Sequence, residues 1–309
     1  MKILITDNVD NLLIELLENN SFILKKAFDI ERPDAISIIE NFDGLIVRNR
    51  LEIDDEFLQK AKKLKFIARF GSGMELIDTN TAKKLGICCL NSAEGNSKSV
   101  AEHTLGLLLG ILRNTKKSMF EMKNKIWNRE GNRGNELSKK TVGIIGYGNT
   151  GSKFAHLLKV FDCKVIAYDK YKFGFGDKFV REVDLNKIYQ FSDIISFHVP
   201  LNKETKYFFN SNLINKMSKK FYLLNTSRGR IVRNEDLIEG LESGKILGAG
   251  LDVHETENKN FSKVKFNSQM NFLLNHENVI LTPHIAGITF ESKINLSNIL
   301  FKKIQKFKQ

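Results

Sequence analysis

Four residues near the middle of the chain have the types and the spacing needed to bind a dinucleotide. Gly146, Gly148 and Gly151 follow one apolar segment, and Asp169 ends the next. In such a pattern the first glycine allows a tight turn, and the second leaves its backbone open to a pyrophosphate. The third lets a helix pack against a sheet, and the acid, about 20 residues farther on, can accept hydrogen bonds from ribose hydroxyls. The spacing therefore predicts a dinucleotide site.

The elements around these glycines strengthen the prediction. Residues 142–145 and 165–168 are expected strands, and the segment between them has apolar residues at helical spacing. The start of that helix offers N–H groups and a partial positive charge to phosphates. Because Asp169 would repel a 2′-phosphate, the sequence predicts NAD rather than NADP. The loop residues also expected to contact the cofactor are Tyr147, Asn149 and Thr150.

The composition indicates a soluble protein with room for two domains. The chain has 309 residues, of which 42% are hydrophobic and 27% charged. It has no apolar run long enough for a membrane span, and residues 1–7 resemble a strand more than a signal peptide, so we expect a cytoplasmic protein with no membrane partner. The three cysteines lack metal-ligand spacing and are expected to be buried and reduced, so no metal is predicted. They are Cys88, Cys89 and Cys163.

The formal net charge of +12 raises the question of a nucleic-acid partner. Lysines are scattered along the chain, and no basic stripe alternates with aromatic residues. We therefore expect a solvated surface and no nucleic-acid partner. Binding to nucleic acid through the positive surface stays an alternative, which a salt-dependent titration would reveal.

Strand and helix signals alternate along the chain, which favours an α/β fold with parallel sheets. A long helix is expected over 97–117, and the final helix over 288–307 could return to the first domain and make it discontinuous. We expect a first domain of residues 1–96 plus 288–309, and a second of residues 97–287. The expected strands are 2–6, 44–47, 66–70, 87–90, 142–145, 165–168, 194–197, 221–225, 247–251 and 279–281.

Four further segments, taken in order with the glycine-rich turn, resemble the D-isomer-specific 2-hydroxyacid dehydrogenase family. The resemblance implies an NAD-dependent oxidoreductase with two Rossmann-like domains: a flavodoxin-like substrate domain and a dinucleotide-binding domain, with the active site in the cleft between them. It also implies a homodimer held by a helical arm over 94–133. Because the chain ends at Gln309, no C-terminal regulatory domain is expected. The segments are 197–201 with Thr205, 225–229, 251–257 and 282–287.

The same resemblance implies the catalytic residues. Arg228 would bind the substrate carboxylate, His284 would be the general acid and base, and Glu257 would pair with His284. A guanidinium can hold a carboxylate through two hydrogen bonds, and histidine suits proton exchange near neutral pH, with a nearby carboxylate favouring its charged form. The family usually has proline after this acid, whereas Asn258 follows Glu257 here, so Glu255 stays an alternative partner.

The resemblance assigns further residues to the cofactor and to a small anionic 2-hydroxy or 2-keto acid. Backbone N–H groups at Ser72 and Gly73 would hold the substrate carboxylate, and Arg48 and Asn49 would reach its far end. Arg48 and Arg50 together would fit a phosphate tail, so 3-phosphoglycerate is the leading substrate. An unphosphorylated acid such as glyoxylate or hydroxypyruvate is the alternative substrate, and the two arginines could instead be a solvated surface pair. The remaining residues assigned to the cofactor are His198, Val199, Pro200, Thr205, Thr226, Ser227, Asp252 and Gly287.

A role without catalysis also stays open, because some relatives in this family act as NAD-sensing corepressors. The full set of arginine, glutamate and histidine favours catalysis. An assay with a panel of keto acids and NADH separates the two.

Overall fold

The computed structural model describes residues 1–308, which form two compact α/β units. The first unit contains residues 1–97, the short segment 259–261 and the chain from Ile288 onward, and the second contains residues 98–258 and 262–287. The domain boundaries expected from the sequence did not include residues 259–261 in the first unit.

The sheet of the first unit has five parallel strands in the order 2-1-3-4-5, which is the flavodoxin-like order. Strand β3 is buried along its whole length, as expected where helices cover both faces of a parallel sheet. The edge strand formed by Ile23–Lys26 was not predicted, because half of its residues are lysines. Across the sheet the strands are β2 (Ile23–Lys26), β1 (Lys2–Ile5), β3 (Gly44–Val47), β4 (Phe66–Arg69) and β5 (Cys88–Asn91).

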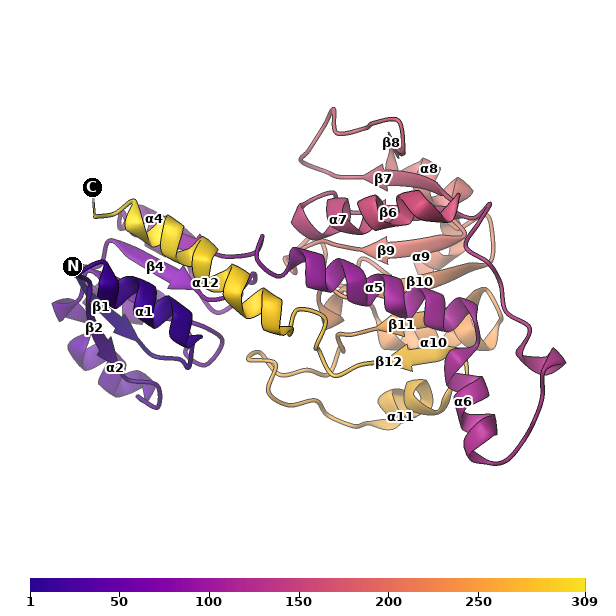
Figure 1. The fold of residues 1–309 in the computed structure, drawn as a ribbon, viewed down its shortest axis with the longest axis horizontal. Helices are drawn as coiled ribbons and strands as arrows, with labels where there is room; N and C mark the ends of the chain where they lie inside the picture. Colours follow the sequence, from indigo (N-terminus) through magenta and orange to yellow (C-terminus); the bar gives the residue numbers. More distant parts are fainter. Residues whose placement is uncertain (309) are drawn as a thin grey trace. The chain divides into compact units, whose positions relative to one another are not determined.

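The last helix of the chain completes the core of the first unit. Helix α12 packs beside α1, although the two are at opposite ends of the sequence (Figure 1). Its buried residues Leu296, Leu300 and Ile304 join a core that includes Ile3, Ile5 and Leu13. The helices of this unit are α1 (Asn11–Asn19), α2 (Arg32–Ile38), η1 (Ile39–Asn41), α3 (Asp55–Lys60), α4 (Thr79–Lys84) and α12 (Phe290–Gln305).

The sheet of the second unit has seven parallel strands. The chain leaves β6 in one direction for β7 and β8 and then crosses over to β9, which is the strand arrangement of the dinucleotide-binding fold. Two parallel-sheet α/β units thus confirm the predicted fold class. Across the sheet the strands are β12 (Val279–Leu281), β11 (Ile246–Leu251), β10 (Phe221–Asn225), β9 (Ile194–Phe197), β6 (Thr141–Ile145), β7 (Lys164–Tyr168) and β8 (Val180–Glu182).

The long helix predicted over 97–117 is in fact two helices. The first of the two ends at Leu112, and Asn114 adopts a left-handed conformation with φ of 51° before the second begins. Asparagine tolerates this region better than most residues, so it turns the chain here. The helices from this point are α5 (Ser97–Leu112), α6 (Thr115–Lys123), η2 (Glu130–Asn132), α7 (Asn149–Leu157), η3 (Leu158–Phe161), α8 (Leu185–Phe191), α9 (Ser211–Lys216), η4 (Gly229–Ile231), α10 (Asn234–Glu242) and α11 (Ser268–Asn275).

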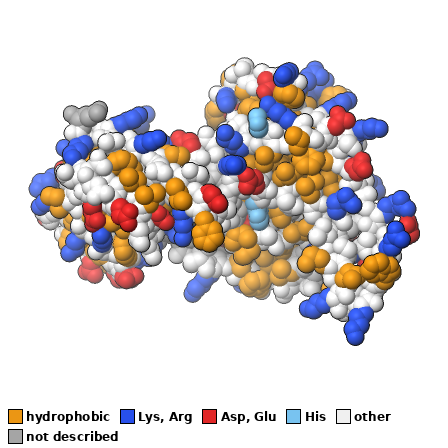
Figure 2. All heavy atoms as spheres, in the orientation of Figure 1, with side chains coloured by type: hydrophobic (Ala, Val, Ile, Leu, Met, Phe, Trp, Pro, Cys, Tyr) orange, Lys and Arg blue, Asp and Glu red, His pale blue; other side chains and the backbone are white. Residues whose placement is uncertain are grey.

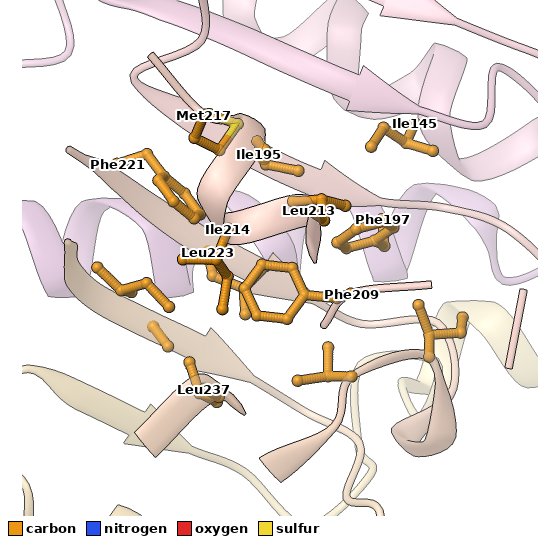
Figure 3. Packing of buried hydrophobic residues seen from close by; sticks show 14 of the residues in the cluster. Ile145, Ile195, Phe197, Phe209, Leu213, Ile214, Met217, Phe221, Leu223 and Leu237 are labelled. Carbon is orange, nitrogen blue, oxygen red and sulfur yellow. The ribbon is translucent and has the colours of Figure 1, made fainter. Parts of the chain in front are cut away.

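Aromatic packing holds the centre of the second unit (Figure 3). The Phe209 ring meets Phe197 and Phe221 edge to face, with centroids 6.0 and 6.2 Å apart. This packing fixes β9 and β10 under their covering segment. In the sheet, Asn225 pairs with Leu251 and Leu251 with Leu281, so β10, β11 and β12 end at the same edge.

The surface agrees with a solvated positive charge, because lysines and arginines are dispersed over the face seen in Figure 2. Within residues 1–308, no helix is both long enough and apolar enough to cross a membrane. The same residues contain no group of three His, Cys, Asp or Glu side chains that could hold a metal ion.

The expectation of buried cysteines was wrong for Cys88, which is exposed. Strand β5 is one of the two edge strands of its sheet, so its side chains are covered less than those of a central strand. Cys89 and Cys163 are partly buried, and burial raises the pKa of the Cys89 thiol to about 11.

Candidate active site

The glycine-rich turn after β6 has the geometry that a dinucleotide needs. Gly146 has φ of 96°, and a Cβ there would lie 2.4 Å from the backbone oxygen of His198. A Cβ on Gly151 would lie 2.1 Å from the backbone oxygen of Gly146, so only glycine fits either position. Around Gly148, by contrast, no heavy atom lies within 4 Å of the Cβ position. The turn is therefore tight at its ends and open in the middle, where a phosphate can approach.

Helix α7 presents its N-terminus to this open space. Gly148 is its N-cap residue, and no side chain caps the helix. The first N–H groups of an uncapped helix and its partial positive charge favour an anion. Asn149 and Thr150, which the sequence assigns to the cofactor, form this first turn.

Asp169 follows β7 and is held by the backbone around it. Its carboxylate accepts hydrogen bonds from the N–H groups of Tyr147 (2.7 Å), Tyr171 (2.9 Å) and Lys172 (3.1 Å). These bonds fix the acid beside the glycine turn. The open turn, the uncapped helix and the fixed acid together fit the pyrophosphate and ribose of NAD.

The other predicted cofactor residues lie after β9 and β10. Desolvation lowers the pKa of the His198 imidazole to about 3, and its Nε2 lies 2.8 Å from Ser196 Oγ. Val199 follows it directly, and Thr205 Oγ1 donates to the Pro200 carbonyl over 2.6 Å. The hydroxyls that follow β10 are fixed as well. Thr226 Oγ1 lies 2.8 Å from Thr104 Oγ1, and Ser227 Oγ donates to Asn225 Oδ1 over 2.8 Å.

The structure pairs His284 with Glu257. The distance from His284 Nδ1 to Glu257 Oε2 is 2.7 Å, and the glutamate side chain is only 9% exposed. Glu255, the alternative partner, instead accepts the N–H of Asn234 at the start of α10 over 2.8 Å. Of the two glutamates that the sequence left open as partners, Glu257 contacts His284, and Glu255 is engaged at the start of α10.

The backbone of His284 is strained, with φ of 55°. A non-glycine residue in this region costs about 1–3 kcal/mol, and such residues cluster at functional sites. The His284 N–H donates to the carbonyls of Asp252 (2.8 Å) and Thr282 (3.0 Å), which hold the turn. In this turn the imidazole lies at hydrogen-bond distance from the Glu257 carboxylate.

Asp252 shapes the same turn with its side chain. It accepts hydrogen bonds from the N–H groups of Ile285 (2.9 Å) and Ala286 (2.8 Å) and from Thr282 Oγ1 (2.6 Å). Burial opposes ionisation of this carboxyl, but the hydrogen bonds that it accepts outweigh burial and lower its pKa. His103 reaches the network from α5, with its Nε2 2.9 Å from Thr282 Oγ1.

Sequence reasoning gave no role to His103 or to the Thr282 side chain. Thr282 stands directly before Pro283 in a segment already singled out, so its position was a usable signal. His103 lies 149 positions before Asp252 and had none. Gly287, assigned to the cofactor by resemblance, comes directly after this turn.

Arg228 follows β10, at the sheet edge where β11 and β12 also end (Figure 1). Its guanidinium donates to the Ser227 carbonyl over 2.6 Å, and its own carbonyl accepts from Asn225 Nδ2 over 2.9 Å. At Gly229, a Cβ would lie 1.9 Å from the His254 carbonyl oxygen. The missing side chain thus lets the Arg228 turn run directly against the segment that leads to Glu257.

The predicted substrate residues of the first unit also lie at strand ends. Arg48 and Asn49 follow β3, and Ser72 and Gly73 come soon after β4. Arg48, Asn49 and Gly73 line one pocket. Arg69, the last residue of β4, lines it too; this residue was not predicted, because it falls inside a predicted strand.

The prediction that Arg50 acts together with Arg48 on the substrate tail was wrong. Arg50 donates to the carbonyls of Thr6 (3.0 Å) and Ile30 (2.5 Å), and its backbone N–H is held by Asp7. It ties together the segments after β1 and β2. Arg69 lines the same pocket as Arg48, and so does Glu75.

Comparison with known proteins identifies relatives over the whole chain. Residues 105–286 match the family model of the NAD-binding domain of D-isomer specific 2-hydroxyacid dehydrogenases. The chain is 35% identical over 302 residues to a hydroxypyruvate reductase of Thermotoga maritima, a match covering 98% of this chain and 96% of the relative. It is 33% identical over 306 residues to a D-3-phosphoglycerate dehydrogenase of Archaeoglobus fulgidus, where the match covers 98% of this chain but only 56% of the relative.

The fold has a close counterpart among solved structures. A D-lactate dehydrogenase from Aquifex aeolicus, complexed with NAD and lactic acid, superposes with a TM-score of 0.83 at 27% identity. The match covers 100% of this chain and 95% of that structure.

Proposed function

Because the chain belongs to the D-isomer-specific 2-hydroxyacid dehydrogenase family, we propose that it interconverts a small D-2-hydroxy acid and its 2-keto acid. It is an NAD-dependent dehydrogenase acting on a CH–OH group. The main support for this proposal is the 2.7 Å contact between His284 and Glu257. Arg228 follows β10, which ends at the same sheet edge as β11 and β12.

When bound, NAD supplies the hydride acceptor or donor. The chain's own residues would orient the substrate and move a proton. Arg228 would hold the substrate carboxylate through two hydrogen bonds. Because Nδ1 of His284 is engaged by Glu257, proton exchange with the substrate oxygen falls to Nε2, and Glu257 stabilises the charged imidazolium.

For the substrate we propose a three-carbon acid, either hydroxypyruvate or its 3-phosphate, whose reduced form is 3-phosphoglycerate. The relative from Thermotoga maritima supports hydroxypyruvate. The positive charge of Arg48, which lies after β3, supports an anionic tail such as a phosphate. Backbone N–H groups at Ser72 and Gly73 would bind the carboxylate end.

The direct test is reduction of a panel of 2-keto acids by the purified protein with NADH. Glyoxylate, hydroxypyruvate and 3-phosphohydroxypyruvate are compared by kcat/KM. We expect turnover of at least one three-carbon acid. Binding of NADH without reduction of any of them would support the corepressor alternative and contradict the enzyme.

Replacing Asp169 with alanine is expected to shift the cofactor preference towards NADP. Losing hydrogen bonds to a charged acceptor costs about 1.5–3 kcal/mol, so kcat/KM for NADH should fall about 10- to 150-fold. The control is Asp169→Asn, which keeps an oxygen acceptor for the backbone N–H groups but lacks the charge. If both variants keep the wild-type ratio of NADH to NADPH activity, Asp169 does not contact the ribose.

We also propose that the helical arm forms a homodimer. The arm exposes a group of large apolar side chains, which in a monomer only water would cover. The largest is Trp127, which is 76% exposed. The others are Met119, Phe120, Met122 and Ile126.

Replacing Trp127 with glutamate is expected to convert a dimer into a monomer, because the charge would be buried in the interface. Sedimentation velocity measures the change. The matched control is Phe173→Glu, since Phe173 is 77% exposed but lies outside the arm. A monomeric wild type, or a dimer that survives Trp127→Glu alone, would contradict the arm as the interface.

A further inference from the structure

Two lysines lie next to Asp169, the acid assigned to the adenosine ribose. Lys170 directly follows it, and Lys172 comes two positions later. Ammonium groups make strong hydrogen bonds to phosphate oxygens, and the 2′-phosphate is what distinguishes NADP from NAD. Cations at these positions would therefore work against the preference for NAD, unless their charges are engaged by other groups.

Lys172 is held by Tyr147 of the glycine-rich turn. Its Nζ donates to the Tyr147 carbonyl over 3.4 Å and lies 5.3 Å from the centre of the Tyr147 ring. That ring in turn stacks on Phe175, with 4.3 Å between the ring centroids. These contacts keep the Lys172 ammonium at Tyr147.

Lys170 is engaged by Glu204, which lies in the loop after β9. Lys170 Nζ donates to Glu204 Oε1 over 2.6 Å, and the Tyr171 hydroxyl donates to Glu204 Oε2 over 2.7 Å. The hydrogen bond from Lys170, followed by that from Tyr171, lowers the pKa of Glu204, so this carboxyl is ionised at neutral pH. Lys170 and Glu204 together thus carry no net charge.

The contact between Lys170 and Glu204 lies at the end of the sheet where the glycine turn begins. Strand β6 lies between β7 and β9, so the contact joins the segments that leave the sheet on either side of β6 (Figure 1). Both segments are fixed locally: Asp169 Oδ1 accepts from the Tyr171 N–H over 2.9 Å, and Asn202 Oδ1 accepts from the Glu204 N–H over 2.9 Å. The two charges are therefore brought together by the backbone on each side.

We propose that Glu204 is a specificity-determining residue, which favours NAD over NADP by balancing the charge of Lys170 next to the ribose acid. Asp169 would repel a 2′-phosphate directly, and Glu204 removes the cation that would attract it. The inference concerns the choice of cofactor, so it holds whichever 2-keto acid is the substrate.

The test is calorimetric titration of the wild type and of Glu204→Gln with NADH and with NADPH, in the absence of substrate. Glutamine keeps the shape of the side chain and removes its charge. Charge pairs exposed to solvent change an equilibrium by about 2- to 5-fold, so the ratio of the NADPH Kd to the NADH Kd should fall by about this factor. The difference should shrink at high salt, because salt screens exposed charges.

Three further variants separate the charge of Lys170 from other effects. Adding Lys170→Met to Glu204→Gln removes the released cation and should return the Kd ratio to the wild-type value. Tyr171→Phe removes one hydrogen bond to Glu204 without changing any charge and should keep that ratio. The matched control is Asp177→Asn, which removes a charge from the same β7–β8 connection; the Asp177 carboxylate lies 3.8 Å from Lys159 Nζ, so the ratio should again stay unchanged.

A Kd ratio in Glu204→Gln equal to that of the wild type would overturn the role of Glu204. So would a lowered ratio that persists after Lys170 is replaced. A wild type that binds NADH but reduces no keto acid would contradict the proposed function alone, because the two Kd values are measured without turnover.

Discussion

Replacing His284 with alanine is expected to lower kcat by about 10²–10⁴-fold while NAD binding stays unchanged. General acid–base catalysis by a positioned side chain contributes a rate factor of this size. The imidazole is bound to Glu257 through Nδ1, whereas the Asp169 carboxylate holds the glycine turn after β6. Loss of the imidazole should therefore affect the chemical step and not the cofactor site. Steady-state oxidation of NADH and calorimetric titration of NAD measure the two quantities separately.

A pair of matched variants tests the partner of His284. Glu257→Gln should slow turnover, because the neutral amide stabilises the imidazolium less. Glu255→Gln should leave kcat nearly unchanged and act mainly on stability, since Glu255 accepts the N–H at the start of α10. Near wild-type turnover in His284→Ala would remove the acid–base assignment. An equal loss of kcat in both glutamine variants would remove the assignment of Glu257.

Replacing Arg228 with lysine is expected to raise KM and lower kcat together. Lysine keeps the positive charge but cannot hold a carboxylate through two parallel hydrogen bonds. A hydrogen bond to a charged group is worth about 1.5–3 kcal/mol, so kcat/KM should fall about 10- to 150-fold. Kinetics with hydroxypyruvate as the varied substrate measure the change.

Arg230 provides the control for this substitution, because it lies two residues away and is exposed. Arg230→Lys should have the kinetics of the wild type. If Arg228→Lys also leaves KM and kcat unchanged, the guanidinium does not bind the substrate carboxylate.

The cofactor site could be predicted from the sequence because its determinants are local. Gly151 packs against Gly146, five residues earlier, and Asp169 directly follows the next strand of the sheet; only the contact of Gly146 with His198 joins distant parts of the sequence. Strands such as β9 and β10 were predicted correctly because buried parallel strands are nearly continuous apolar runs.

Two edge strands escaped prediction for the opposite reason. Strand β2 is half lysine, and β8 has only three residues, so neither has an apolar pattern. Both exist because a neighbouring strand offers its hydrogen-bonding edge, which is a property of the folded sheet and not of the segment itself.

The catalytic residues were assigned through family resemblance, since residues 257 and 284 have no spacing that would pair them. Their contact depends on β11 and β12 ending at one sheet edge and on the strained backbone at His284. The inward turn of Arg50 could not be foreseen, because it depends on carbonyls of residues 6 and 30 that only the fold brings near.

The return of α12 to the start of the chain has a consequence for synthesis on the ribosome. The second unit is one stretch of chain, residues 98–287, interrupted only by residues 259–261. It can therefore fold once residue 287 has emerged from the ribosome. The sheet of the first unit is made before the second unit, but it lacks Leu296, Leu300 and Ile304 until these residues have been made as well. During that interval its apolar face is uncovered and open to chaperones, so the half made first is the half that matures last.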